Sequence, residues 1–166
     1  MLDLSQTFQD WQIFYATIAG VTATLLGLLF VAISINLDVF SGKDLHYKRL
    51  ARLTLGKFLN MLIVSLVFLF PHQSAHGVGI TIVIVCGLGA WDTLNYILQA
   101  RTLENNTYST IHLLPLITYL ALTGFAILLM IRFDTTWLHW LGAAVIVMLI
   151  SASRHAWELM VKFPKA

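Results

Sequence analysis

The chain has 166 residues, of which 58% are hydrophobic and 11% are charged, and its formal net charge is +2 at pH 7. Soluble domains carry about 25% charged residues, and a mean hydropathy of +0.81 excludes a soluble fold of this size, because too few polar residues remain to cover its surface. The single cysteine, Cys86, excludes an intramolecular disulfide and a CxxC motif, and the basic residues form no patch interleaved with aromatic residues, as nucleic-acid binding would require.

Five apolar runs follow one another along the chain, and each is long enough to cross a bilayer as a helix. Helices are expected because a spanning segment must satisfy its own backbone hydrogen bonds. The sequence therefore predicts an all-α polytopic membrane protein, a single domain over residues 1–166 that folds as a bundle of about five transmembrane helices. An even number of spans, such as four, would arise if the fourth and fifth runs formed one re-entrant hairpin or if one of them did not insert. The predicted spans cover residues 11–36, 50–70, 78–100, 111–131 and 137–160.

The first span is rich in small residues. They form two rows at a spacing of four residues, which would permit the close approach of a neighbouring backbone, within the bundle or between protomers. We therefore interpret this span as a packing helix and expect the protein to form homo-oligomers. One row consists of Ala16, Gly20 and Thr24, and the other consists of Ala19, Ala23 and Gly27.

The same span contains the segment from Gly20 to Ile35, which reads GVTATLLGLLFVAISI. This segment resembles the first helix of a loose group of small bacterial membrane proteins, in which a run of small residues is followed by Gly-Leu-Leu-Phe-Val-Ala and a β-branched or Ser end. The group is uncharacterised. The resemblance therefore implies a location in the bacterial inner membrane, but it implies no catalytic or binding residue.

The segment Ser41–Arg52 is the most highly charged stretch of the chain. Cytoplasmic loops of membrane proteins carry an excess of Lys and Arg, so we predict an outer N-terminus and a cytoplasmic C-terminus. The segment itself is expected to bind lipid head groups, with docking of a soluble partner as the alternative. The basic loop residues on the predicted cytoplasmic side are Lys43, Lys48, Arg49, Arg52, Arg101, Lys162 and Lys165, whereas Arg132 lies on the opposite side.

Polar residues inside the spans are costly in hydrocarbon and are therefore candidates for function. In three spans they recur at helical spacing on one face. At about 1.5 Å per residue, Asp92 lies roughly 12 Å and Arg154 roughly 9 Å from the cytoplasmic ends of their helices. We expect one polar cluster in the cytoplasmic half, with an ion pair between Asp92 and Arg154 and with Lys57 as the competing cation. The cluster comprises Lys57, Asn60, Asp92, Asn95, Arg154, His155 and Glu158.

Two interpretations of this polar cluster stay open. It could line a vestibule, or one wall of an ion or proton path, that opens to the cytoplasm. Alternatively, its residues fix the register of the helices through buried polar contacts, while the longer charged side chains reach the head groups. The outer halves of the second and third spans contain almost no polar residue, so a continuous pore would require an oligomer with an apolar gate.

Histidines form the only other candidate site. His72 and His76 share one loop and His139 begins the last span on the same side, so the three could meet around a metal ion. No carboxylate is fixed beside them. We therefore interpret them as solvated loop residues and expect no metal and no other cofactor.

These features predict an oligomeric protein of the inner membrane, in contact with bilayer lipid, that acts as an ion channel or small-solute conduit with a cytoplasm-facing polar vestibule. The alternative is a non-conducting regulator or effector subunit that docks a soluble or membrane partner at residues 41–52. An enzyme is the least favoured class, because the chain offers no acid–base or nucleophile constellation beyond Asp92, His155 and Glu158.

Overall fold

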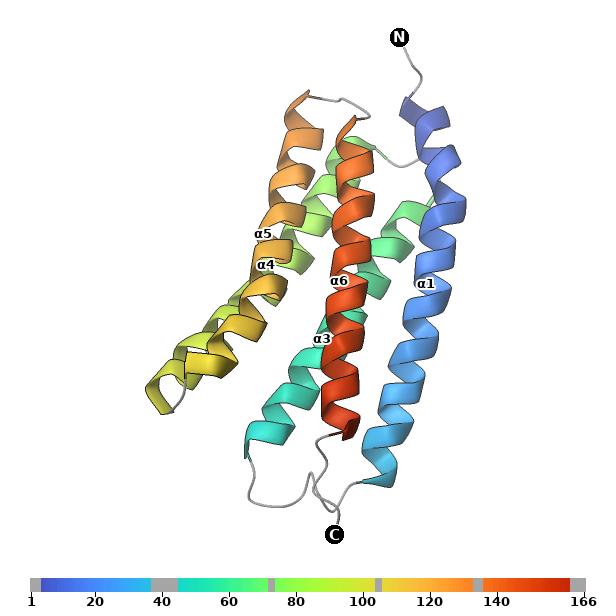
Figure 1. Cartoon of the computed structure of the whole chain (residues 1–166). Coiled ribbons are helices and arrows are strands. Elements are labelled where there is room, and N and C mark those ends of the chain that lie inside the picture. The colour runs from blue at the N-terminus through green and yellow to red at the C-terminus, as the bar shows by residue number, and fades with distance from the viewer. Residues whose placement is uncertain (1–3, 37–44, 72–73, 104–105, 133–135, 162–166) are drawn as a thin grey trace.

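The computed structural model describes residues 4–36, 45–71, 74–103, 106–132 and 136–161, which form five helices and no strand (Figure 1). Each helix contains a stretch that is long and apolar enough to cross a membrane. The prediction of an all-helical, multi-pass membrane protein is therefore confirmed. In chain order the helices are α1 (Leu4–Ile35), α3 (Leu45–Leu69), α4 (Ala75–Leu103), α5 (Asn106–Arg132) and α6 (Thr136–Val161).

The helices extend beyond the predicted spans at several ends. α3 begins at Leu45 rather than near Leu50, and it therefore contains the basic residues Lys48 and Arg49 in addition to Arg52. α5 also begins earlier than predicted, at Asn106. Hydropathy marks only the part of a helix that lies in hydrocarbon, whereas the backbone hydrogen bonds of the helix can continue into the polar interface.

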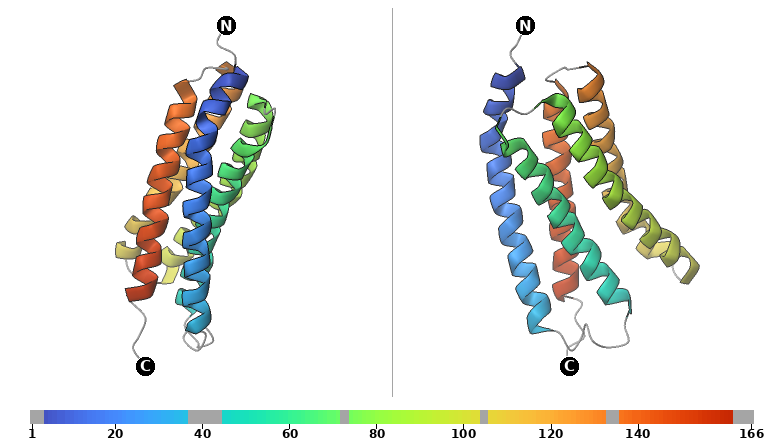
Figure 2. Two further views of the ribbon diagram at one scale, coloured as in Figure 1. Left: turned by 90° about the vertical axis from the view of Figure 1, so that its right-hand side faces the viewer. Right: turned by 180° about the vertical axis from the view of Figure 1, so that it is seen from behind.

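Consecutive helices run antiparallel, so that α1 begins and α6 ends at opposite ends of the bundle (Figure 1). We call the end where α1 and α6 begin the N-terminal end, and the end where α3 begins and α6 stops the C-terminal end. α1 packs mainly against α3, and α4 packs mainly against α5, whereas α6 contacts α3 and α5 and touches α1 less. Toward the C-terminal end, α4 and α5 lean away from α6 and α1 (Figure 2).

Two clusters of buried residues hold the bundle together. The larger cluster draws on all five helices. The smaller cluster contains residues of α1, α3 and α6, among them Leu29, Phe58 and Leu159, and lies toward the C-terminal end. Since α4 and α5 contribute nothing to this smaller cluster, the side of α3 that faces them is not covered by a packed core there.

Glycines permit the closest helix contacts of the bundle. A Cβ added at Gly79 of α4 would overlap the side chain of Met130 on α5, and a Cβ added at Gly89 would lie 2.5 Å from Cζ of Tyr119. A larger residue at either position would push α4 away from α5, so the two glycines set the distance between these helices.

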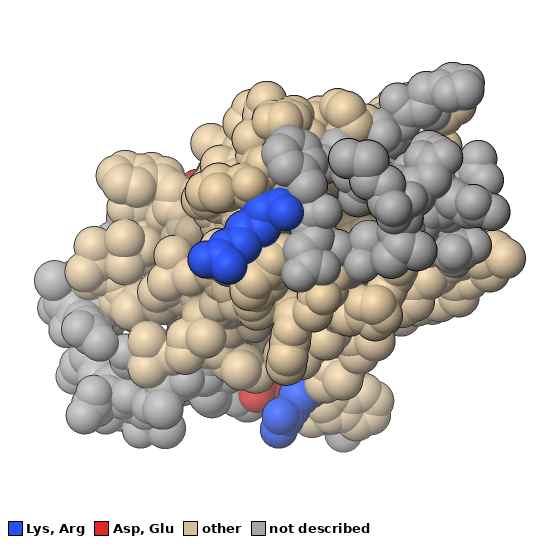
Figure 3. Space-filling model, turned by 90° about the horizontal axis from the view of Figure 1, so that it is seen from above, with Lys and Arg blue, Asp and Glu red and all other residues tan. Residues whose placement is uncertain are grey.

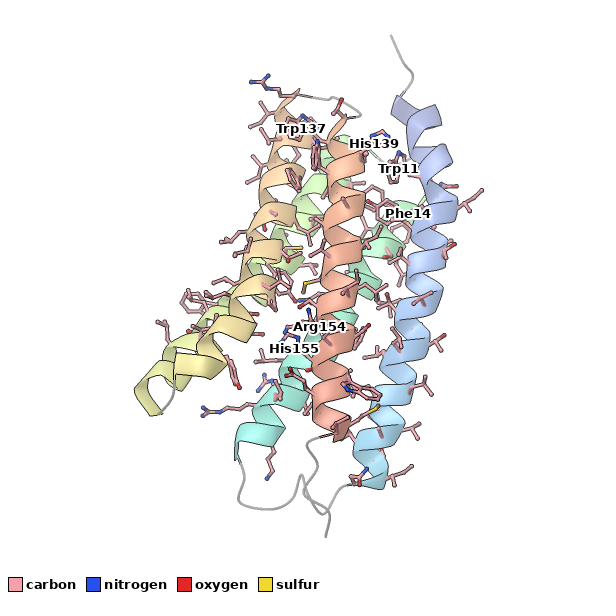
Figure 4. All side chains as sticks on the ribbon, in the orientation of Figure 1. Trp11, Phe14, Trp137, His139, Arg154 and His155 are labelled. Atoms are coloured by element: carbon pink, nitrogen blue, oxygen red, sulfur yellow. The ribbon has the colours of Figure 1, made fainter. Side chains whose placement is uncertain are left out.

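Aromatic rings attach α1 to the rest of the bundle near the N-terminal end (Figure 4). Tyr15 stacks on Phe68 of α3 with the ring centroids 3.8 Å apart. Trp11 meets the ring of His139 on α6 edge-on, at a centroid distance of 5.0 Å. The same Trp11 ring occupies the space beside Gly142, where an added Cβ would lie 2.8 Å from it. These contacts anchor α1 to both α3 and α6.

Candidate functional site

A cleft opens between α3 and α4 toward the C-terminal end of the bundle. Its volume is about 530 Å³, within the range of small-molecule binding sites. Leu26 of α1 and Tyr119 of α5 complete its walls. The charged and amide side chains that line the cleft are Arg49, Arg52, Lys57, Asn60, Asp92 and Asn95.

One face of α3 forms the first wall of the cleft. Arg49, Leu53, Gly56 and Asn60 line it at a spacing of three or four residues, so they share one side of the helix. Gly56 leaves the middle of this wall open, because a Cβ added there would meet no atom within 4 Å. The basic end of this face lies at the C-terminal end of the bundle.

Lys57 is the most deeply buried charged residue of the cleft, with only 2% of its surface exposed. Its Nζ makes no hydrogen bond to any described residue, although Glu158 and His155 of α6 lie within electrostatic range. A buried ammonium group without hydrogen bonds is costly. An anion should therefore bind more favourably at Lys57 than at Arg49 or Arg52, which lie nearer the start of α3 and are better solvated.

α4 supplies the opposite wall. Asp92 is exposed and Asn95 is half-buried, and both line the cleft. Thr93 also lines it, but its hydroxyl donates a hydrogen bond of 2.8 Å to the carbonyl oxygen of Gly89 and is satisfied within the helix. Since the α3 wall carries three cationic side chains and the α4 wall one carboxylate, the lining of the cleft has a net positive charge.

A hydrogen bond closes the inner end of the cleft. Nδ2 of Asn60 donates to the hydroxyl oxygen of Tyr119 at 3.1 Å, and Gly89 gives both side chains the room to meet. Behind this pair lies a cavity of about 10 Å³ among apolar residues such as Cys86 and Met148. That volume is at the lower limit for a single water molecule, so the cleft is blind in the monomer.

The residues of the predicted polar cluster divide between two places. Lys57, Asn60, Asp92 and Asn95 line the α3–α4 cleft. Arg154 and Glu158 line a second cavity of about 710 Å³ between α1 and α6. The cluster divides because α4 packs against α3 and α5, and α6 presents these two side chains to the side where α1 lies.

His155 and Arg154 are neighbours on the C-terminal half of α6 but differ in environment (Figure 4). His155 is buried, and its Nδ1 donates a hydrogen bond of 2.6 Å to the carbonyl oxygen of Ser151. Arg154 is exposed. In the described part of the chain no ion pair joins Arg154 to Asp92, since the two residues line different cavities.

Arg49, Arg52 and Tyr119 are among the residues of the cleft that were not assigned to a site from the sequence. Arg49 and Arg52 were interpreted as part of a head-group-binding segment, although the helical spacing from Arg49 to Asn60 could have placed Arg49 with the polar cluster. Tyr119 gave no comparable signal. Only the packing of α5 against α4 brings its hydroxyl group to Asn60.

The small-residue rows of α1 mostly face away from the other described helices. Ala19 is buried, whereas Ala16, Gly20, Ala23, Thr24 and Gly27 are exposed. A Cβ added at either glycine would meet no atom within 4 Å. The rows were expected to pack against a helix of the same bundle or against another protomer. Within the described bundle, Ala19 is the one residue of the two rows that is buried.

Of the three histidines considered as metal ligands, the structure describes His76 and His139. His72 lies outside the described residues, and His139 packs its ring against Trp11. His76 is exposed. Within the described ranges, no group of three His, Cys, Asp or Glu residues is arranged to hold a metal ion.

No protein-family model matches the chain, and searches of curated proteins and of solved structures found no match to it. The chemistry of the cleft is defined by its own residues: three cations, one carboxylate and two amides between aliphatic side chains. Such a lining suits an anionic ligand.

Proposed function

We propose that this protein is an oligomeric channel or conduit of the bacterial inner membrane and that the α3–α4 cleft is its cytoplasm-facing vestibule for a small anion. The observation that carries the proposal is Lys57, a buried cation that lines the cleft and makes no hydrogen bond to a described residue. Arg49 and Arg52, which lie nearer the start of α3, would attract anions into the cleft.

The distribution of charge supports the orientation that this function requires. Lys48, Arg49 and Arg52 lie at the C-terminal end of the bundle, whereas Arg132 ends α5 at the opposite end. Seen from the N-terminal end, the described surface carries few charged side chains (Figure 3). By the positive-inside rule, the C-terminal end faces the cytoplasm and the N-terminus lies outside.

The blind end of the cleft identifies where a path would have to open. The hydrogen bond between Asn60 and Tyr119 separates the cleft from the apolar core, so this pair would act with the core residues behind it as a gate. Self-association is supported by α1, whose span is the least buried of the five and presents most of its small residues outward.

Anion flux from proteoliposomes tests the proposed function. We expect the wild type to release chloride or inorganic phosphate faster than protein-free vesicles do. Lys57→Met should lose most of this flux, because it keeps the shape of the side chain and removes its charge. Lys48→Met is the matched control, because Lys48 is exposed and does not line the cleft. Equal flux in wild type and Lys57→Met would refute the role of the cleft.

Cysteine labelling tests the orientation separately. Thr136 begins α6 at the N-terminal end and Lys48 lies at the C-terminal end, and both are exposed. In intact cells, a thiol reagent that does not cross the inner membrane should label Thr136→Cys and should label Lys48→Cys only after lysis. The reverse pattern would invert the topology.

Docking of a partner at residues 41–52 stays the alternative function. Residues 41–44 lie outside the described residues, and the described remainder forms the start of α3. Lys48 is exposed there and does not line the cleft, which leaves it accessible to a partner. Lys48→Glu should then reduce partner binding while anion flux is unchanged.

A further inference from the structure

We infer that the α3–α4 cleft binds an anionic glycerophospholipid from the surrounding leaflet, with the lipid phosphate at the cations of α3. The inference shares with the proposed function the assignment of an anion to Lys57. It depends on neither conduction nor self-association, so the two can fail separately.

The cleft is amphipathic in the sense that a lipid requires. Its cationic side chains come from α3, and the aliphatic side chains of Leu26, Leu53 and Leu59 line the same space. Leu59 is 48% exposed on the outside of the bundle as well as lining the cleft. The cleft therefore opens sideways, through the part of the bundle that faces lipid, and a chain bound along these leucines could continue into the bilayer.

The cations are spread along α3 rather than gathered at one point. Arg49 and Lys57 are eight residues apart, which corresponds to roughly 12 Å along a helix. A small free anion could contact only some of them at a time. A phospholipid head group supplies several acceptor oxygens over a longer distance, and arginine side chains match phosphate oxygens geometrically.

The remaining polar groups favour a head group that carries hydroxyls. Asp92 faces the cleft from the opposite wall, and a carboxylate can only accept hydrogen bonds. It would accept a hydrogen bond from a glycerol hydroxyl, a group that an inorganic anion does not supply in the same position. The half-buried amide of Asn95 can donate as well as accept. These residues and the net positive lining together point to phosphatidylglycerol rather than to a zwitterionic lipid.

Calorimetric titration of the delipidated, detergent-solubilised full chain tests the inference. The probes are dihexanoyl phosphatidylglycerol, dihexanoyl phosphatidylcholine, glycerol 3-phosphate and inorganic phosphate. We expect the first to bind at least about tenfold more tightly than the other three, a difference of about 1.4 kcal/mol. Tighter or equal binding of glycerol 3-phosphate or phosphate would overturn the lipid assignment, and equal binding of the zwitterionic lipid would overturn the assignment of charge.

Three variants locate the binding in the cleft. Lys57→Met removes the buried charge, Gly56→Leu fills the open wall, and Arg52→Gln removes the charge of an exposed residue of the cleft. Each should weaken phosphatidylglycerol binding, and the first two by about tenfold or more. Gly87→Leu is the control for Gly56→Leu, because Gly87 is exposed on α4, outside the cleft, and an added Cβ meets no atom within 4 Å. The site would be refuted if Arg52→Gln and either Lys57→Met or Gly56→Leu bound phosphatidylglycerol as tightly as the wild type does.

Two mixed outcomes separate this inference from the proposed function. Lys57-dependent binding of phosphatidylglycerol without anion flux would support the lipid site and refute the conduit. Lys57-dependent flux without a preference for phosphatidylglycerol would overturn the lipid site and leave the conduit standing.

Discussion

Gly89→Ala perturbs the contact that closes the cleft. The added Cβ would lie 2.5 Å from Cζ of Tyr119 and 2.6 Å from Nδ2 of Asn60, distances that real Cβ contacts do not reach. The side chains must move, and their hydrogen bond of 3.1 Å must lengthen or break. Because Gly89 is buried between α4 and α5, the strain cannot be relieved into solvent or lipid.

The expected loss of stability follows from three contributions. Overpacking a closely packed site costs about 1–3 kcal/mol, and loss of the hydrogen bond between Asn60 and Tyr119 costs about 1 kcal/mol. Alanine stabilises a helix relative to glycine by about 0.5–1 kcal/mol. The free energy of unfolding should therefore fall by about 1–3 kcal/mol, a change of roughly 5- to 150-fold in the unfolding equilibrium constant.

The single cysteine provides the assay. Cys86 is only 1% exposed and lies in the core beside Tyr119, so a maleimide should react with it only after the bundle opens. Labelling across a titration from mild detergent into SDS then reports unfolding without an introduced probe. Gly87→Ala on the same helix adds the same methyl group where no atom lies within 4 Å. If Gly89→Ala resists SDS as well as Gly87→Ala does, the packing of α4 against α5 described above is wrong.

The same labelling assay tests three further contacts. Tyr119→Phe removes the acceptor of the Asn60 hydrogen bond and should cost about 1 kcal/mol; a cost that is unchanged when Asn60 is also substituted would show that the two side chains are not coupled. Gly142→Ala should cost about 1–3 kcal/mol, because its Cβ meets the ring of Trp11, and wild-type stability would mean that α1 is not anchored there. Phe68→Ala removes a fully packed ring and should cost about 3–5 kcal/mol; a loss below about 1 kcal/mol would contradict its burial.

Some features of the fold could be predicted from the sequence because the bilayer permits few alternatives. An apolar run of about 20 residues in hydrocarbon must be helical, so the five spans were correct. The helices themselves extend past these spans, since the residues of α3 before Leu50 are polar enough to be taken for a loop but still continue the helix. Hydropathy carries no information about where backbone hydrogen bonds stop outside the membrane.

The composition of the cleft could be predicted only in part. Helical spacing placed Asp92 with Asn95 on one face of its helix, and the depth of the residues placed Lys57 and Asn60 at the same level. Neither spacing nor depth gives the rotation of each helix about its own axis, which decides the neighbour that its polar face meets. Arg154 satisfies the same spacing and depth as Asp92, yet it lies on the far side of α6, in the cavity beside α1.

The sequence by itself determined that the chain crosses a membrane as helices and that its charged residues gather toward one end, because these properties follow from hydropathy and position along the chain. Tertiary structure alone decided which polar faces meet. α4 and α5 form a close pair through Gly79 and Gly89 and lean away from α6 and α1 toward the C-terminal end. This arrangement turns part of the predicted polar cluster into a cleft, because α4 and α5 add no residue to the buried cluster that α3 forms with α1 and α6 there.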